Sequence, residues 1–320
     1  MNFTGCRFRN AYAHTSHGLL DVLRWKLGAR EKARSSIGPG GAETLPLAEP
    51  AAPTRRLSAT PAYGSVRLTW IGHSTFLLQH LGRAILTDPI FSDCQPLPIS
   101  TLRRVRPPGV RLQDLPRIDD VLISHSHYDH LDAPTVRALG GGVRYWVPEG
   151  LAGWFRRRKV DSCTEVRWWQ SCALSDEIAI HCVPAQHASG RTPFDRNRTH
   201  WCGWVLQSAE RTVYFAGDTG YSPSFCEIGE RFGGFDAAMI PIGAYSPRWL
   251  MKPMHLDPAE AVQAHIDIRS KHSIACHWGT YRLTDELLDE PPRELARELA
   301  LRHIDANDFR VLQPGETLEI

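Results

Sequence analysis

Four residues able to bind metal lie within one six-residue segment near the middle of the chain. They are His125, His127, Asp129 and His130, directly after the apolar run 121–123. We predict that this run is a strand whose extended end carries His125 and His127. Because side chains on a strand alternate with a period of two, both imidazoles would point to the same side and could bind one ion. Asp129 and His130 would lie in the following turn, aimed at a second ion.

Further candidate ligands follow three other predicted strands. They are His187 after Val183-Pro-Ala-Gln, Asp218 after Phe215-Ala-Gly, and His277 after Ile274-Ala-Cys. A lone histidine at the end of a strand is more often structural than metal-bound. The cluster at 125–130 needs more ligands than it contains, however, so metal binding becomes the better interpretation of all three. Imidazole and carboxylate ligands together are typical of zinc, with iron and manganese as alternatives.

This arrangement resembles the metallo-β-lactamase fold family, whose seven ligands occur in the same order along the chain. The matching positions are the HxHxDH segment at 125–130, His187, Asp218 and His277. The resemblance implies that His125, His127 and His187 hold one zinc ion and that Asp129, His130 and His277 hold a second, with Asp218 bridging the two. It also implies an α/β fold, a four-layer αββα sandwich of two mixed β-sheets with the metals at one edge.

A narrower resemblance is to the N-acylphosphatidylethanolamine-hydrolysing phospholipases D and their bacterial relatives. It extends from about residue 67 to the C-terminus and is carried by the segments 69–75, 86–92, 123–132, 215–221, 240–249, 255–258 and 277–280. Leu23-Arg-Trp25 also resembles the family. Two positions depart from it: Met254 replaces a glutamine, and Ala188 replaces a large aromatic residue. Both departures concern contact with substrate, and neither removes a ligand.

The expected function is that of a dinuclear zinc hydrolase. Two neighbouring cations can lower the pKa of a shared water and polarise a phosphoryl oxygen, so that hydroxide would attack phosphorus directly. By resemblance, the substrate would be an N-acylphosphatidylethanolamine, cleaved to phosphatidic acid and an N-acylethanolamine. The alternative is a hydrolase of a lactone, a thioester or another ester, because the metal ligands alone do not choose between phosphorus and a carbonyl carbon. A non-catalytic metal-binding protein is a weaker interpretation, because all seven ligands are retained.

The candidate catalytic residues are Asp129, Asp218 and His255. Asp218 would position the attacking water, and the family resemblance makes His255 a further functional residue. The competing interpretation of His255 is that it merely neighbours Asp257, which begins a helix. We also expect Asp88 to order a turn or to orient a ligand histidine through a hydrogen bond. His73 either contacts a ligand or only packs in the core, and we slightly prefer packing.

Residues 1–65 are predicted to form an N-terminal helix over 17–28 and a Pro- and Gly-rich connector over 31–65, and residues 66–320 the catalytic domain. Strand signals cover 66–71, 75–79, 84–87, 120–124, 143–147, 178–183, 204–207, 212–216 and 237–240. Helices are predicted near 133–139, 223–231, 257–268 and 293–302.

Composition narrows the classes of partner. With 37 Lys and Arg against 35 Asp and Glu, the 320-residue chain has no excess positive charge to bind nucleic acid. The eight cysteines form no CxxC pair and are expected to be reduced. Without an apolar signal segment, a cytoplasmic location is the expectation. The segment 154–159 either contacts a membrane surface peripherally or is a solvated helix face, and the sequence favours neither. The expected partner is a phospholipid or another phosphodiester substrate; a homodimer stays open.

Overall fold

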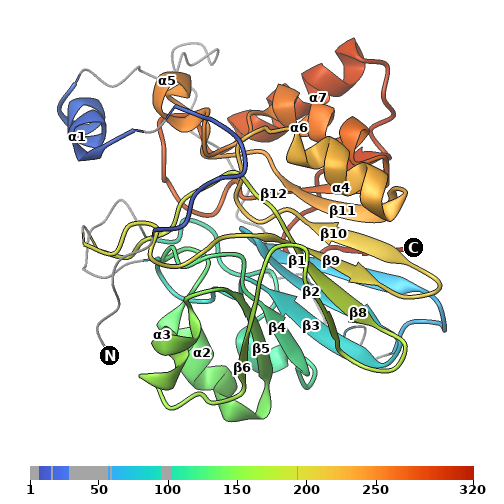
Figure 1. Cartoon of the computed structure of the whole chain (residues 1–320). Helices are drawn as coiled ribbons and strands as arrows, with labels where there is room; N and C mark the ends of the chain where they lie inside the picture. Colours follow the sequence, from blue (N-terminus) through green and yellow to red (C-terminus); the bar gives the residue numbers. More distant parts are fainter. Residues whose placement is uncertain (1–6, 16, 29–56, 58–59, 95–102, 193) are drawn as a thin grey trace.

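The central strands are buried along almost their whole length, which requires a sheet covered on both faces. The structure is a computed structural model that describes residues 7–15, 17–28, 57, 60–94, 103–192 and 194–320. Two seven-stranded sheets lie face to face, and helices cover the outer face of each (Figure 1).

The first sheet has the strand order β14-β1-β2-β3-β4-β5-β6. Neighbours from β14 to β3 are antiparallel, and neighbours from β3 to β6 are parallel. The strands are β1 (Val66–Gly72), β2 (Thr75–His80), β3 (Arg83–Thr87), β4 (Asp120–Leu122), β5 (Arg144–Pro148), β6 (Cys163–Val166) and β14 (Thr317–Glu319).

The second sheet has the order β13-β12-β11-β10-β9-β8-β7. Its strands are parallel from β10 to β13 and antiparallel from β7 to β10, so β8, β10, β11 and β12 all run in one direction. They are β7 (Ser171–Ala173), β8 (Ala179–Val183), β9 (Gly203–Gln207), β10 (Thr212–Phe215), β11 (Phe235–Pro241), β12 (Ser270–Cys276) and β13 (Phe309–Arg310).

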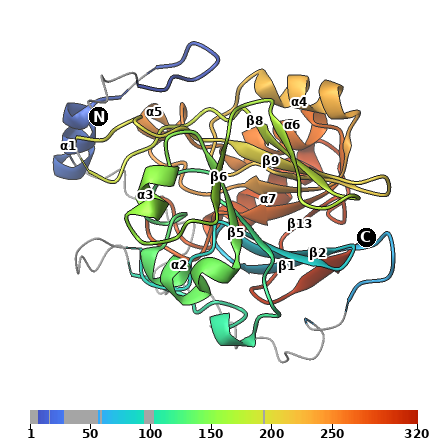
Figure 2. The same cartoon turned by 60° about the horizontal axis from the view of Figure 1, so that its bottom comes forward.

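The helices form the two outer layers. In Figure 2, α2 (Ala133–Leu139) and α3 (Ala152–Arg156) lie on the side of the first sheet, and α4 (Ser224–Phe232) and α6 (Pro258–Asp267) on the side of the second. The remaining helices are α1 (Leu19–Leu27), α5 (Arg248–Met251) and α7 (Glu290–Leu301), with short 3-10 turns at Leu112–Asp114 and Gly140–Gly142. Helices α2 and α6 each follow an aspartate, Asp132 and Asp257 respectively, whose carboxylate accepts a backbone N–H of the first turn.

Alternate side chains of the first sheet pack into different cores. Trp70 and Phe76 belong to the core between the sheets together with Trp204 and Phe215 of the second sheet. Their neighbours, such as Leu77, pack instead in the core beneath α2 and α3. This two-sided burial confirms the predicted αββα sandwich with two mixed sheets.

The structure differs from the predicted elements in several places. Strands β6, β7, β13 and β14 and helices α3 and α5 were not predicted, because each has only two to five residues. Of β12 only the carboxyl end at Ile274-Ala-Cys was expected, because the strand begins with the polar residues Ser270-Lys-His. Helix α7 begins at Glu290 rather than at 293, since two prolines fit its first turn. Strand β4 ends at Leu122, so His125 and His127 lie in the loop beyond the strand and not on its extended end.

The N-terminal part contacts the predicted catalytic domain where it is described. Trp25 of α1 donates its indole N–H to Asp285 at 2.7 Å, and Leu57 is buried in the core beneath α2 and α3. Most of the predicted connector lies outside the described residues, and the boundary at residue 65 stays a prediction. Within the described ranges, no helix is long and apolar enough to cross a bilayer, and the seven cysteines found there form no disulfide.

Candidate metal centre

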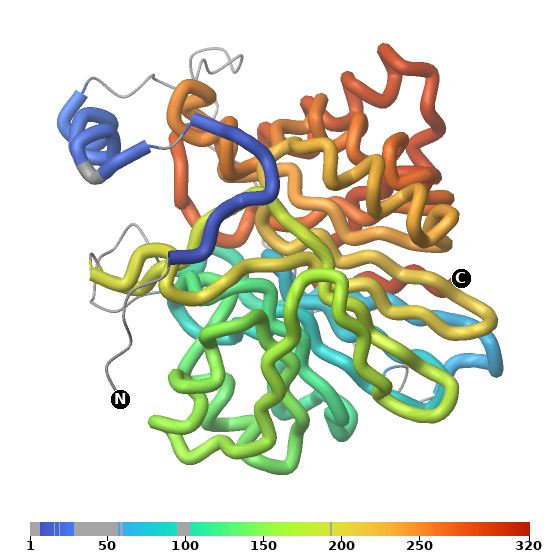
Figure 3. The backbone as a smooth tube through the Cα atoms, in the orientation of Figure 1, coloured from blue at the N-terminus to red at the C-terminus, as the bar shows by residue number. Residues whose placement is uncertain are grey.

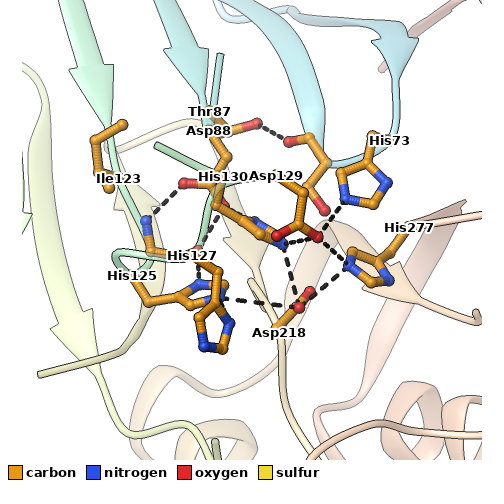
Figure 4. A network of polar contacts seen from close by, with 12 residues as sticks. His73, Thr87, Asp88, Ile123, His125, His127, Asp129, His130, Asp218 and His277 are labelled. Atoms are coloured by element: carbon orange, nitrogen blue, oxygen red, sulfur yellow. Dashed lines mark hydrogen bonds and ion pairs between the residues drawn. The ribbon is translucent and has the colours of Figure 1, made fainter. Parts of the chain in front are cut away.

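All seven predicted ligands lie in loops at one edge of the sandwich. These loops follow the carboxyl ends of β4, β8, β10 and β12, so that two facing sheets contribute to one site. Figure 4 shows His125, His127, Asp129, His130, Asp218 and His277 from close by. Strand β4 leads to the segment 125–130, β8 to His187, β10 to Asp218 and β12 to His277. The structure therefore brings together residues that are up to 152 positions apart, from His125 to His277.

Three histidines form one group. His125 Nε2 lies 2.8 Å from His127 Nδ1, and His187 Nε2 lies 3.2 Å from the same His127 atom. One nitrogen from each ring lies within 4.8 Å of the others, which is close enough for all three to bind a single ion.

Asp129, His130 and His277 form a second group. Asp129 Oδ2 lies 3.4 Å from His130 Nε2 and 3.4 Å from His277 Nε2. The group therefore offers one carboxylate oxygen and two imidazole nitrogens around a common point.

Asp218 lies between the two groups. Its Oδ2 atom is 3.1 Å from His130 Nε2 and 3.1 Å from His277 Nε2. The same oxygen is 3.8 Å from His187 Nε2 and 4.0 Å from His125 Nε2. A single carboxylate thus faces both sets of nitrogens, as a bridging ligand must.

Charge within the site is arranged around the two buried carboxylates. Burial alone would raise the pKa of Asp218, but His130 and His277 outweigh it and hold that pKa well below its usual value. For Asp129, burial is likewise outweighed, chiefly by His130, and the pKa is again well below its usual value. Both groups are therefore anionic at neutral pH, as metal ligands need to be.

The two histidine groups differ in charge. Burial lowers the pKa of His125 and His187 well below the usual value, and also lowers that of His127, so these rings are neutral and can donate an electron pair. Burial acts in the same direction on His277, but Asp218 and Asp129 outweigh it and raise its pKa to about 9. A cation bound there would take the place of that proton as the partner of the carboxylates.

Three buried polar atoms at the centre make no hydrogen bond among the described residues: Oδ1 of Asp218, and Nε2 of His130 and Nε2 of His277, whose contacts with Asp218 Oδ2 at 3.1 Å are ion pairs without hydrogen-bond geometry. Leaving such atoms unsatisfied costs free energy in the interior of a protein. All three are ligand atoms of the kind that zinc and similar cations bind. The residues present therefore fit a metal cation, and the cluster is able to bind metal.

Asp88 holds the loop that carries the first ligands. Its Oδ2 accepts from His130 Nδ1 at 2.6 Å, and its Oδ1 accepts the backbone N–H of Ser124 at 2.6 Å. The hydroxyl of Ser124 also contacts the Asp88 carboxylate and lies 2.9 Å from His125 Nδ1. These contacts confirm the predicted role of Asp88, because they fix which nitrogen of His130 faces the centre.

The preferred interpretation of His73, that it only packs in the core, is wrong, and the alternative, contact with a ligand residue, is confirmed. The Nε2 atom of His73 lies 3.0 Å from Asp129 Oδ2, so the ring contacts a predicted ligand directly (Figure 4). His73 has a left-handed backbone conformation with φ 55°, held by the N–H of His277 donating to its carbonyl at 3.0 Å. The sequence offered one sign of this contact: His73 follows β1 directly, in a Gly-His-Ser turn at the same edge of the sandwich as the ligands.

His255 reaches the same site from the loop before α6. Its Nδ1 lies 3.9 Å from Asp218 Oδ2, and its ring lies 5.1 Å from that of His187. Arg248 donates to the carbonyl of His255 at 2.9 Å and also contacts Asp257, the first-turn cap of α6. His255 therefore lies both near the N-terminal cap of α6 and near the candidate metal ligands.

Met254, which stands where the resembling family has a glutamine, still contacts the site through its backbone. The backbone carbonyl of Met254 lies 2.9 Å from His187 Nδ1, so that the ring turns its Nε2 toward Asp218. A backbone carbonyl supplies this contact whatever the side chain, which explains why a methionine is compatible with the His187 geometry.

Comparison with known proteins agrees with this geometry. Residues 83–278 match the family described as the β-lactamase superfamily domain. The chain therefore belongs to the β-lactamase superfamily, and its histidine and carboxylate cluster makes it a metal-dependent hydrolase of that superfamily.

Individual proteins and solved structures are also similar to this chain. The chain is 40% identical to an uncharacterized protein of Mycobacterium tuberculosis, over 94% of this chain and 78% of the relative. It is 39% identical to the N-acyl-phosphatidylethanolamine-hydrolyzing phospholipase D 1 of Caenorhabditis elegans, over 78% of this chain and 75% of that protein. Among solved structures, an isothiocyanate hydrolase from Delia radicum gut bacteria shares the fold, with a TM-score of 0.66 and 21% identity over 79% of this chain and 98% of the other.

We expect Asp88→Asn to weaken metal binding by about 10- to 100-fold, the range for partners that orient metal ligands. The amide is nearly the same size but presents an N–H group where His130 needs an acceptor. Competition with a chromogenic chelator measures the affinity. Asp119→Asn is a matched control, because that carboxylate accepts only the N–H of Ala84, away from the ligands. Unchanged affinity in Asp88→Asn would show that His130 needs no such support.

Proposed function

We propose that the protein is a dinuclear zinc hydrolase. In this assignment His125, His127 and His187 hold one ion, Asp129, His130 and His277 hold the other, and Asp218 bridges them. The observation that carries it is the position of Asp218 Oδ2, within 4.0 Å of a nitrogen of four of these histidines, two from each group. Iron or manganese would accept the same imidazole and carboxylate set.

Two such ions, if bound there, would lower the pKa of a shared water molecule and polarise a phosphoryl oxygen. Asp218 would help to hold both ions and, as a hydrogen-bond acceptor, would position the attacking water. The reaction forms one bond from the water oxygen to phosphorus and breaks the bond from phosphorus to the leaving alkoxide, which takes up a proton. No serine or cysteine nucleophile is needed, so no covalent enzyme intermediate forms.

We propose an N-acylphosphatidylethanolamine-like lipid as the substrate, cleaved to phosphatidic acid and an N-acylethanolamine. The support is the 39% identity with the Caenorhabditis elegans enzyme of that activity, over most of both chains. The fold itself does not choose the substrate, since a protein with the same fold hydrolyses an isothiocyanate. The alternative substrates are therefore a lactone, a thioester or another ester.

The substrate assignment is tested by assaying the zinc-loaded protein against N-acylphosphatidylethanolamine, a lactone, a thioester and a simple carboxylic ester. We expect release of N-acylethanolamine and phosphatidic acid, abolished by a chelator and restored by zinc. Asp218→Asn is the matched inactive control, since it keeps the shape of the site but removes the charge. Hydrolysis of the carbonyl substrates without release of N-acylethanolamine would replace the proposal by the alternative.

His255 is proposed to donate a hydrogen bond to the phosphoryl group or to the leaving alkoxide. Burial lowers its pKa to about 4, so the ring is neutral at pH 7 and keeps one N–H to donate. Its Nδ1 is buried beside Asp218, whereas the side chain as a whole is 13% exposed, so Nε2 is the ring nitrogen that a substrate would reach. This contact would stabilise charge that develops on oxygen in the transition state.

We expect His255→Ala to lower turnover by about 100-fold or more, the range for proton-transfer and hydrogen-bonding groups in catalysis. Bound zinc should stay at the wild-type level, which metal analysis of the same sample measures. His303→Ala, at an exposed position after α7, is the control. Unchanged turnover would make the role of His255 structural, and loss of zinc would make His255 a ligand.

We propose that the protein meets its lipid through a basic surface formed by Arg137, Arg156, Arg157, Arg158 and Lys159. In the segment 154–159, Trp154 and Phe155 are buried, and the four residues that follow are exposed. Arg137 of α2 lines the same cavity of about 400 Å³ as Arg157, Arg158 and Lys159. Within the described residues, Arg137, Arg157 and Lys159 form no ion pair, so their charge is available to anionic headgroups.

We expect binding to vesicles that contain phosphatidic acid to weaken as salt is raised, because each basic side chain near an anionic surface contributes about 1 kcal/mol. Arg157→Gln combined with Lys159→Gln should weaken sedimentation with vesicles at low salt. Arg293→Gln combined with Arg297→Gln, both exposed on α7, is the charge-matched control. Binding that does not respond to salt would mean that apolar insertion dominates instead.

A further inference from the structure

The N-terminal segment 7–14 lies against the loop that carries His187, although it precedes the residues matched by the superfamily domain. In Figure 3 this dark-blue segment passes next to the yellow-green chain that follows β8. The backbone N–H of Phe8 donates to the carbonyl of Asn197 at 2.9 Å. The Phe8 ring is stacked on His200, with ring centroids 4.5 Å apart. The segment is therefore held on the catalytic domain by both polar and aromatic contacts.

Asn10 in this segment contacts the backbone of His187 at two points. Its Nδ2 donates to the carbonyl of His187 at 2.9 Å, and its Oδ1 accepts the N–H of His187 at 3.0 Å. The Oδ1 atom also accepts the indole N–H of Trp201 at 2.8 Å. Because an indole N–H only donates, the amide can face Trp201 only with its oxygen, which fixes the orientation of the whole carboxamide.

His187 needs this support because it lies beyond the end of β8, where no neighbouring strand pairs with its backbone. Its ring is oriented separately, by the contact of Nδ1 with the carbonyl of Met254 at 2.9 Å. Asn10 thus fixes the backbone of the residue, and Met254 fixes the rotation of its ring. Together they direct Nε2 toward His127 and Asp218.

We propose that Asn10 is a positioning residue for the metal ligand His187. Through it the N-terminal segment would hold one ligand of the metal centre in place. The proposal rests on the proposed assignment of His187 to the first ion. The carboxamide replaces the backbone pairing that a strand would supply, and it comes from a part of the chain that sequence patterns separate from the catalytic domain. Loss of Asn10 leaves the His187 backbone without either contact and moves its Nε2 away from the ion.

The test is a zinc titration of the full-length metal-free protein in competition with a chromogenic chelator, which reports each equivalent separately. For Asn10→Ala we expect one equivalent to bind about 10-fold more weakly, since removal of a partner that orients a ligand has at least that effect. The other equivalent should bind as in the wild type. Substitution with cobalt should also change the visible absorption of the loaded protein, because that band reports the geometry of the ligands.

Tyr12→Phe is the matched control. It removes a different contact of the same segment with the domain, the hydrogen bond from the Tyr12 hydroxyl to Glu227, and does not touch His187. We expect it to leave both equivalents and the cobalt spectrum unchanged. Thermal unfolding of the metal-free proteins shows whether either variant merely loosens the segment.

Two results would overturn the proposal. One is Asn10→Ala binding both equivalents with wild-type affinity and spectrum. The other is an equal weakening in Asn10→Ala and Tyr12→Phe, which would make the effect one of docking the segment and not of placing His187. Failure of the proposed dinuclear centre is distinguishable from both, because the wild-type protein itself would then bind fewer than two equivalents.

Discussion

The buried carboxylate of Asp218 is the group on which the rest of the site depends. An ionised carboxylate in the interior is costly unless cations or hydrogen-bond donors surround it. Here the side chain is 2% exposed, and five histidines place a ring nitrogen within 4.0 Å of its Oδ2. Its Oδ1 has no hydrogen-bond partner within the described part of the chain. An anion presented in this way demands positive charge, which bound cations supply more fully than protons on His130 and His277.

The fold provides this arrangement at the ends of strands from two facing sheets, where the ligand loops approach other backbone segments closely. Gly217, just before Asp218, has φ 62°, and a Cβ there would lie 2.7 Å from that of Ser124. A Cβ at Gly243 would lie 2.2 Å from the carbonyl of His277. Left-handed conformations at Asp88 and His277 are strained for residues with side chains and persist only where surrounding contacts enforce them. The loops therefore approach each other closely, and the contacts that enforce the left-handed conformations also hold the ligands at fixed positions.

Local patterns in the amino-acid sequence predict strands and helices of an α/β fold and candidate ligands at strand ends, and the family resemblance adds the four-layer sandwich and the grouping of the seven ligands. Apolar runs that end in His or Asp mark strand ends, and the spacing at 125–130 is specific. What could not be predicted depends on distant contacts. His73 resembles any packed histidine until its ring is seen beside Asp129, 56 positions along the chain. Asn10 lies 177 positions before His187, in a segment with no pattern that links it to the site. Strands β6 and β7 lack the apolar alternation that would reveal them, since the sheet edges expose them.

The proposed reaction needs both ions, because the shared water would be activated only when each group of ligands is filled. The most direct measurement is activity against metal content: metal-free protein is reconstituted with increasing zinc, and bound zinc and release of N-acylethanolamine are measured in the same samples. We expect little turnover while the first equivalent binds, and a rise that ends when about two equivalents are bound. Full activity at one equivalent, or activity that persists without metal, would contradict this proposal.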